Sequence, residues 1–386
     1  MMRSIAPLPF KFERESIHTP LIENPMHTVI DAPMNRPVVA YTSRALPETP
    51  RLLDASALGL DARVRCHERE PGQAPLFIEC ADDGLRDRAA FRAWFAQVRP
   101  IIDALIVRHG TVVLRGFPIA ETDDFAALVA EFPKFTGDYA GGRAPRSAVK
   151  GDVMEATRLE ASVQLALHSE MAYMRDYPRR LAFFARRIAA RGGETTIGDM
   201  RTLVAGLPQA AVAKLHAHKT RMATNYGPKS DALQPTYAHM DLRGWNHAFF
   251  TDDPQDVERL CAHKGLTPIW NPDGSLTLLT PLDPFVSHPQ TGQLLYRSVI
   301  HMRPQSQSDA LSRQIRATQQ HPTGATLGTG ESLSAEELHQ IDTACAARTV
   351  HWRWQAGDVM LVDNLQVWHG RNPYEGERET QVALLN

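Results

Sequence analysis

The sequence predicts a mainly β protein in which helices pack around a β-rich core, in one elaborated domain. Short apolar runs recur along the chain, as in TVVLRGF (111–117) and LAFFARRI (181–188), and such runs are typical of buried strands. Turn signals separate the runs, for example Asp273-Gly274 between two strand-like segments. The clearest helical segment has a single apolar face, which suits a helix that covers a core.

The composition favours a globular protein with a small-molecule ligand. The chain has 386 residues, of which 43% are hydrophobic, so it can bury a large core. Its 42 basic and 44 acidic residues are spread along the sequence, and the net charge of -2 gives no electrostatic reason to expect nucleic acid or membrane as partner. The four cysteines lie far apart without a C-x-x-C pair, so we expect reduced thiols in a cytoplasmic protein. The composition leaves the oligomeric state open.

Residues 1–74 are expected to form a proline-rich N-terminal arm, ahead of a domain at 75–386. The first 50 residues contain eight prolines, which remove backbone donors and discourage continuous helix or central strand. A partly disordered tail is the alternative interpretation of this composition. The N-terminus, MMRSIAPLPFKFERE, lacks the apolar stretch of a signal peptide, and no later run reaches membrane-spanning length.

The first half of the domain alternates strand and helix signals. After the strand-like PLFIEC (75–80), apolar residues recur at helical spacing from Phe91 to Ile106, and Gly110 ends this helix. The other elements expected here are a strand at 111–117, a short capped helix at 123–132, a loop at 143–152, strands at 161–173 and 181–188, and a tight turn at the paired glycines 192–193.

The second half combines a long helix, a long loop and several short strands. Pro208 divides the predicted helix at 199–219, because proline cannot donate the hydrogen bond that a helix interior needs. Residues 221–255 are rich in glycine, proline, asparagine and aspartate, which is typical of a long ordered loop that could cover a site. The other expected elements are a hairpin at 267–280, a polar stretch with helical character at 304–345, and short strands within 349–371 and 377–386.

The stretch LALHSEMAYM (165–174) carries a candidate metal-binding pair. On a strand, the side chains of residues i and i+2 leave the same face, so His168 and Glu170 can offer an imidazole and a carboxylate to one point. A second imidazole from a remote strand would complete a set of two histidines and one carboxylate, which leaves open positions on Fe(II). The spacing alone is a weak signal, because about two such matches are expected by chance and two are found. The other match, His239 with Asp241, is the alternative pair.

Six blocks of sequence occur in the order found in a known enzyme family. They are HGTVVLRGF (109–117), LHSEMAY (167–173), GGETTIGDMR (192–201), GWNHAFFTDD (244–253), SHPQTGQ (287–293) and DNLQVWHGRNPYEGER (363–378). Through these blocks, residues 75–386 resemble the taurine dioxygenase-like (TauD/TfdA) Fe(II)/2-oxoglutarate oxygenases, especially the branch that includes clavaminate synthase and the SyrP-type amino-acid hydroxylases.

The resemblance implies a fold, a metal site and a reaction. The fold is a double-stranded β-helix, the jelly roll of cupin-like proteins, and the iron ligands are His168, Glu170 and His369. The co-substrates are 2-oxoglutarate and O2. Glu170 indicates hydroxylation, because related halogenases carry a small residue there that does not bind the metal.

Binding of 2-oxoglutarate requires a cation for its distal carboxylate. Arg378 fits this role, because in RETQVALL it shares a strand face with Thr380, Val382 and Leu384 and would point inward with them, and an inward arginine without an anion would be costly. The alternative is an ion pair with Glu377 or Glu379 in solvent, and Arg371 is the second candidate anchor. The resemblance gives Thr195 the role of supporting the carboxylate through its hydroxyl.

The same resemblance points to an amino-acid or amino-acid-derived substrate in natural product biosynthesis, free or tethered to a carrier protein. A carboxylate or a phosphopantetheine group would require cations near the site, and the candidates are Arg243, Arg297 and Arg201. Two segments depart from the branch, namely QLLYRS (293–298) and the first 70 residues. Substrate specificity is therefore not carried over with the chemistry.

Other functions fit parts of the pattern. The same scaffold could catalyse desaturation or cyclisation in place of hydroxylation. A catalytically silent jelly-roll binding protein would need none of the three metal ligands, and a cupin-type hydrolase or isomerase with zinc or manganese would leave Arg378 and Thr195 without a purpose. The whole pattern therefore predicts an Fe(II)/2-oxoglutarate-dependent dioxygenase.

Overall fold

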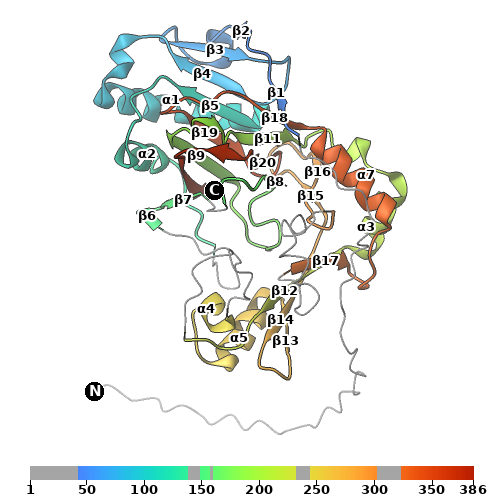
Figure 1. Ribbon diagram of the computed structural model, residues 1–386. Coiled ribbons are helices and arrows are strands. Elements are labelled where there is room, and N and C mark those ends of the chain that lie inside the picture. The colour runs from blue at the N-terminus through green and yellow to red at the C-terminus, as the bar shows by residue number, and fades with distance from the viewer. Residues whose placement is uncertain (1–41, 138–147, 157–159, 232–243, 302–322) are drawn as a thin grey trace, which may run out of the picture.

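The computed structural model describes residues 42–137, 148–156, 160–231, 244–301 and 323–386. Within them, two large sheets enclose a common core, helices cover the outer faces, and a smaller sheet lies beside the two (Figure 1). This arrangement is a jelly roll surrounded by helices. The predicted mainly β fold class is therefore confirmed.

The larger sheet has nine strands in the order β2-β3-β4-β5-β19-β9-β22-β7-β6. Its only parallel pair among these described strands is β4 with β5. The strands are β2 (Arg51–Leu53), β3 (Val64–Glu68), β4 (Leu76–Cys80), β5 (Thr111–Arg115), β6 (Ala148–Lys150), β7 (Val153–Glu155), β9 (Arg180–Arg187), β19 (Val359–Asp363) and β22 (Glu379–Leu385).

The facing sheet has five strands in the order β1-β18-β11-β20-β8. Its strands are β1 (Arg44–Ala45), β8 (Leu165–His168), β11 (Thr195–Asp199), β18 (Thr349–His351) and β20 (Val367–Arg371). β20 lies between β11 and β8, and both pairings are antiparallel. The register of β11, β20 and β8 therefore brings together residues near 168, 197 and 369.

Alternation along the strands divides the apolar side chains between two cores. Phe183 of β9 packs inside the jelly roll with Ile197 and Val367 from the facing sheet. Its neighbour Phe184 points to the opposite face and packs under the helices. Strands that are apolar on both faces read as continuous hydrophobic runs, which explains why these runs were recognisable in the sequence.

The outer face of the nine-stranded sheet is covered by α1 (Arg88–His109) and α2 (Thr122–Val129). The Asp87 side chain accepts a hydrogen bond from the N–H of Ala90 and so caps α1, and Gly110 ends the helix with a φ of 75°. A capping box between Glu121 and Asp124 starts α2. The predicted helices at these positions are confirmed.

The outer face of the five-stranded sheet is covered by α3 (Gln209–His218) and α7 (Ala335–Ala346). Trp368 of β20 points into this outer cluster, where it is 1% exposed. Side chains alternate along β20, so Val367 and His369 point to the other face, toward the interior of the jelly roll.

A smaller sheet with its own apolar core lies beside the jelly roll (Figure 1). Its strand order is β13-β14-β12-β17, and the hairpin predicted at 267–280 is confirmed as β13 and β14. The elements here are β12 (Thr220–Tyr226), α4 (Trp245–Phe249), α5 (Pro254–Lys264), β13 (Thr267–Trp270), β14 (Leu276–Leu282) and β17 (Thr323–Leu327). The remaining elements are the pair β10 (Arg191–Gly192) and β21 (Tyr374–Glu375), the pair β15 (Phe285–Ser287) and β16 (Leu294–Tyr296), and the 3-10 turns η1 (Ser56–Leu58), η2 (Asp83–Arg86) and η3 (Val204–Gly206).

Several sequence-based boundaries were wrong. Part of the predicted loop at 143–152 is strand β6, and part of the predicted loop at 221–255 is strand β12 and helix α4. Most of β12 hydrogen-bonds on both sides, to β14 and β17, and this tertiary pairing cannot be read from the segment itself, which has no continuous apolar run. The helix predicted at 199–219 begins only after Pro208, and the described part of 304–345 is β17 followed by α7.

The described part of the predicted N-terminal arm, residues 42–74, contributes strands to both large sheets. β3 pairs with β4 along its whole length, and β1 pairs with β18. The domain boundary at residue 74 stays a prediction. The four cysteines are free thiols, as expected, and within the described ranges no helix is long and apolar enough to span a membrane.

Candidate active site

Two histidines face each other inside the jelly roll. His168 is the last residue of β8, His369 is the central residue of β20, and the two are partners in the antiparallel pairing. Their ring centroids lie 4.3 Å apart. Gly370 allows the strands to approach, because a Cβ at this position would lie 2.5 Å from the backbone oxygen of Leu165. The strand register therefore brings together two imidazoles that are remote in sequence.

The carboxylate of Glu170 reaches the same point from outside the strand. The predicted strand at 161–173 was wrong here, because β8 ends at His168 and a turn follows. Met171 in this turn has a φ of 55°, a left-handed conformation that is rare for a residue with a side chain. Alternation along a strand therefore does not explain the convergence of His168 and Glu170, and the turn brings them together instead.

The three side chains form a compact donor set. One ligand atom from each of His168, Glu170 and His369 can be chosen so that all three lie within 4.8 Å of one another. Nε2 of His369 is 3.9 Å from Oε2 of Glu170, and the exposed fractions of these two side chains are 5% and 13%. No other group of three or more histidine, cysteine, aspartate or glutamate residues in the described ranges could hold a metal ion.

The chemistry of this donor set suits a divalent transition metal. Two neutral imidazoles and one carboxylate on one face of an ion leave its remaining positions free, as in the facial triad of non-haem Fe(II) oxygenases. Nδ1 of His168 lies 3.0 Å from the backbone oxygen of Ala166, so an Nδ1–H donated there leaves the Nε2 lone pair free for a metal. The donor set therefore fits the Fe(II) ion that the sequence resemblance implies.

A cationic site lies beside the triad on the same strands. Thr195 and Arg371 are register partners on β11 and β20, two residues along from the pair Ile197 and His369. Nη2 of Arg378 donates to the Thr195 hydroxyl over 3.1 Å, and its Nε donates to the oxygen of Gly193 over 2.6 Å. Thr195, Arg371 and Arg378 therefore converge, although Arg378 precedes β22 and is not on the strand as predicted.

The two arginines differ in how they are held. Nη2 of Arg371 donates to the backbone oxygens of Glu160 and Val163, at 2.8 and 2.6 Å. Arg378 forms no ion pair with a carboxylate among the described residues, so the predicted alternative of pairing with Glu377 or Glu379 is wrong: Glu377 pairs with Arg187 and Glu379 with Arg186. Burial lowers the pKa of Arg378 to about 10, and the charge of Arg371 adds to this shift. A bound anion would offset both effects.

Arg297 is a third cationic side chain close to the triad. It is 5% exposed, its Nη2 donates to the oxygens of Met171 and Met174 at 2.7 and 3.2 Å, and its guanidinium carbon lies 3.6 Å from the ring centroid of Tyr177. Burial lowers the pKa of Arg297 to about 10. No carboxylate within the described ranges pairs with Arg297. Its hydrogen bonds to Met171 and Met174 attach it to the turn that carries Glu170.

The remaining predicted site residues are not brought to the triad by described contacts. All three guanidinium nitrogens of Arg201 have partners, namely the carboxylate of Asp199 and the backbone oxygens of Arg108 and Gly72. Arg243 and the alternative pair His239 and Asp241 lie outside the described residues.

Sequence reasoning missed Asn364, which is fully buried in the turn between β19 and β20. Its side-chain amide hydrogen-bonds to both backbone groups of Glu170. The signal was present in the block DNLQVWHGR, where a polar pair interrupts an apolar run, but only the histidine and arginine of that block were singled out.

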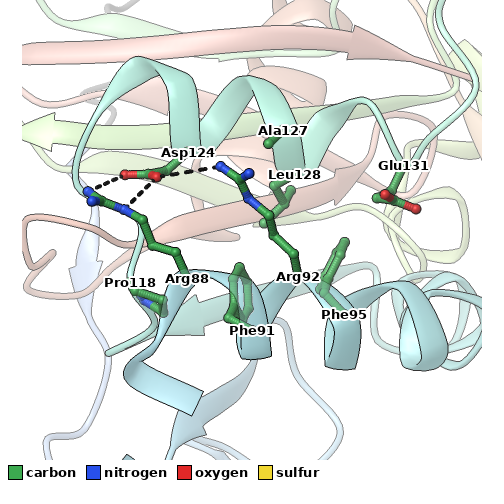
Figure 2. Close-up of a pocket in the computed structure, with 9 residues that line it drawn as sticks. All are labelled: Arg88, Phe91, Arg92, Phe95, Pro118, Asp124, Ala127, Leu128 and Glu131. Atoms are coloured by element: carbon green, nitrogen blue, oxygen red, sulfur yellow. Dashed lines mark hydrogen bonds and ion pairs between the residues drawn. The ribbon is translucent and has the colours of Figure 1, made fainter. Parts of the chain in front are cut away.

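A separate cavity of about 110 Å³ lies between α1 and α2 (Figure 2). None of the predicted site residues lines it. Figure 2 shows Arg88 and Arg92 both directed at Asp124, with nitrogen–oxygen distances of 2.8 and 3.9 Å. The arginines of α1 neutralise a carboxylate that caps α2, so these three side chains connect the two helices.

The jelly roll and its inward-facing donor set define a mononuclear metal-dependent oxygenase. The model of the "Taurine catabolism dioxygenase TauD, TfdA family" matches residues 86–384 of the chain. The chain therefore belongs to the TauD/TfdA family, and it is an Fe(II)- and 2-oxoglutarate-dependent oxygenase that uses O2.

Relatives with similar sequences include proteins of a bacterium and of a plant. The chain is 28% identical over 289 residues to the dapdiamide synthesis protein DdaC of Enterobacter agglomerans, and the aligned residues cover 74% of this chain and 84% of that protein. It is 27% identical over 287 residues to a clavaminate synthase-like protein of Arabidopsis thaliana, with coverage of 73% and 83%. Among solved structures, PvcB from Pseudomonas aeruginosa aligns with a TM-score of 0.48 and 15% identity, covering 84% of this chain and 92% of that one.

Proposed function

We propose that this enzyme hydroxylates an unactivated C–H bond of an amino acid or amino-acid-derived substrate, free or tethered to a carrier protein. In this proposal His168, Glu170 and His369 bind Fe(II), and Arg378, Thr195 and Arg371 bind 2-oxoglutarate. Residues 75–386 are proposed to form the catalytic domain. Desaturation or cyclisation on the same scaffold is the alternative outcome.

The observation that carries the proposal is the convergence of the triad. Ligand atoms of His168, Glu170 and His369 within 4.8 Å of one another come from two strands and a turn. Two imidazoles and one carboxylate that converge on one point offer the donor atoms of the facial triad that binds Fe(II) and leaves its other positions open.

The cationic site supports the second half of the proposal. Along an antiparallel strand two residues span about 7 Å, so Thr195 and Arg371 lie one such step from the Ile197 and His369 pair. A short keto dicarboxylate can span this step, with its keto-acid end at the triad and its distal carboxylate between Arg378 and Thr195. The guanidinium fork of Arg378 and the Thr195 hydroxyl would donate hydrogen bonds to that carboxylate.

In this proposal the protein contributes binding, orientation and exclusion of water. With Fe(II) bound, the site supplies the oxidation of substrate C–H to C–OH by O2, coupled to decarboxylation of 2-oxoglutarate to succinate and carbon dioxide. His168 and His369 are fixed by the β8–β20 pairing, and Glu170 fills the third protein position. Because Glu170 keeps that position occupied, hydroxylation is favoured over halogenation.

The substrate class is supported by sequence relatives and by the buried Arg297. Two relatives are described as a dapdiamide synthesis protein and a clavaminate synthase-like protein, in accord with a substrate from natural product biosynthesis. Arg297 donates hydrogen bonds to the turn that carries Glu170 and has no carboxylate partner in the described part of the chain. A substrate carboxylate would fit the chemistry of this cation.

We expect anaerobic addition of Fe(II) and 2-oxoglutarate to give a weak visible metal-to-ligand charge-transfer band. The band reports chelation of the metal by the keto acid, so it tests the metal site and the co-substrate site together. Absorption difference spectra against enzyme with Fe(II) and succinate provide the measurement and its control. Absence of the band in correctly folded protein would contradict the proposed function.

For the substrate, we expect one amino acid of a panel, free or loaded on a carrier protein, to gain the mass of one oxygen atom. The gain should require both Fe(II) and 2-oxoglutarate and should match the succinate formed. Mass spectrometry of the panel measures it. A product that instead loses two hydrogen atoms would favour desaturation or cyclisation.

A further inference from the structure

Asn364 connects the turn that precedes β20 with the turn that follows β8. Its Oδ1 accepts a hydrogen bond from the N–H of Glu170 over 2.8 Å, and its Nδ2 donates to the backbone oxygen of Glu170 over 3.0 Å. One side-chain amide therefore holds both backbone groups of this residue. Asn364 is 0% exposed, so no water competes for these bonds.

The rest of the amide is used as well. Nδ2 also donates to the oxygen of Pro178 over 2.7 Å, and the Ser169 hydroxyl donates to the Asn364 backbone oxygen over 2.8 Å and lies 3.3 Å from Oδ1. The orientation of the amide is defined by these partners, because a flipped amide would set its NH2 group against the N–H of Glu170. Among the common side chains, only an amide offers an acceptor and two donors from one planar group at this length.

Glu170 needs such a support more than the two histidines do. His168 and His369 are held by the strand pairing, which ends at His168. Glu170 lies beyond it, next to a residue with a φ of 55°. The backbone of Glu170 is therefore fixed relative to His369 mainly through the turn that contains Asn364, five residues before His369 in the chain.

We propose that Asn364 is a positioning residue, which fixes the Glu170 carboxylate at the correct distance from His168 and His369. The proposal rests on the metal site put forward under the proposed function. The Asn364 amide holds the Glu170 backbone and so restricts the turn to one conformation, in which the Glu170 carboxylate faces the metal ion. Loss of the amide should weaken metal binding through Glu170, even though Asn364 itself contacts no ligand atom.

The test uses Mn(II) as a redox-stable probe, with free Mn(II) measured by electron paramagnetic resonance in the absence of substrate. We expect Asn364→Ala to raise the Kd for Mn(II) by about 10- to 100-fold, the range seen when groups that orient metal ligands are removed. Gln366→Ala is the matched control. Gln366 is a buried amide of the same turn, 1% exposed, but it donates to Val107 and Asp363 and does not contact the Glu170 turn.

A double-mutant cycle separates positioning from general loss of stability. In the Glu170→Ala background, Asn364→Ala should change the Kd for Mn(II) by less than threefold (a difference of about 0.7 kcal/mol), because its effect is transmitted through Glu170. Asn364→Asp covers the case in which the alanine variant does not fold, since it keeps an acceptor of the same size and loses both donors. It should also weaken Mn(II) binding more than Gln366→Ala does.

The outcomes are distinct. If the wild-type enzyme binds no Mn(II), the proposed metal site fails. If the wild type binds Mn(II) but the Asn364 variants lose no more affinity than Gln366→Ala, or lose as much without Glu170 as with it, the positioning role of Asn364 is overturned while the metal site stands.

Discussion

Succinate formation should disappear in the Glu170→Ala variant while the fold stays intact. The carboxylate is the only anionic member of the triad, so its removal leaves a divalent ion with two neutral ligands. Loss of a direct ligand should exceed the roughly 10- to 100-fold cost of losing an outer partner. The measurement is substrate-dependent succinate release, with circular dichroism and thermal unfolding to verify the fold.

The matched control is Glu131→Ala. Glu131 is an exposed carboxylate that lines the cavity between α1 and α2 (Figure 2), and no residue of the triad lines this cavity. Its removal should leave turnover unchanged. Unchanged turnover in Glu170→Ala, by contrast, would show that the ligand assignment is wrong. Equal losses of turnover in both variants would indicate that the α1–α2 cavity also affects catalysis.

Much of the fold was predictable because its central strands are buried on both faces. Phe183 and Phe184 of β9 pack into different cores, so the strand is apolar without interruption from Leu181 to Ala185 and is easily recognised. The same holds for β5 and for the apolar face of α1. These segments carry their structure in local composition, and their prediction required no knowledge of strand partners.

The errors arose where tertiary pairing decides the structure. β12 has no continuous apolar run, and β14 and β17 supply hydrogen bonds on both of its sides. At the site, the strand alternation used to join His168 with Glu170 does not apply, since Glu170 lies in a turn. The residues were correctly chosen, but the reason for their proximity was different.

The position of His369 opposite His168 illustrates what sequence alone cannot provide. The register of β8 and β20 depends on Gly370, which permits close approach, and on the turn at Asn364. A one-residue slip would turn His369 outward and Trp368 inward. The family resemblance supplied the ligand set, whereas the register that brings it together is a property of the assembled sheet.

The second large effect is expected at the co-substrate site, where Arg378→Met should raise the KM for 2-oxoglutarate by about 100-fold. Charge-assisted hydrogen bonds contribute about 1.5–3 kcal/mol each, and about 1.4 kcal/mol corresponds to a factor of ten. The Thr195 hydroxyl would also lose its donor from Arg378. Initial rates over a series of 2-oxoglutarate concentrations measure the change, and the KM for the primary substrate should change much less.

Two further variants decide which property of Arg378 matters. Arg378→Lys keeps the charge and loses the planar fork, so an intermediate KM would indicate that bidentate geometry contributes beyond charge. Arg92→Met, at an exposed arginine of the α1–α2 cavity, controls for loss of a cation remote from the triad. If Arg378→Met left the KM for 2-oxoglutarate unchanged, the distal carboxylate would have to be bound by Arg371, the neighbouring cation whose charge already lowers the pKa of Arg378. An increase in KM specific to Arg371→Lys would then establish that second anchor.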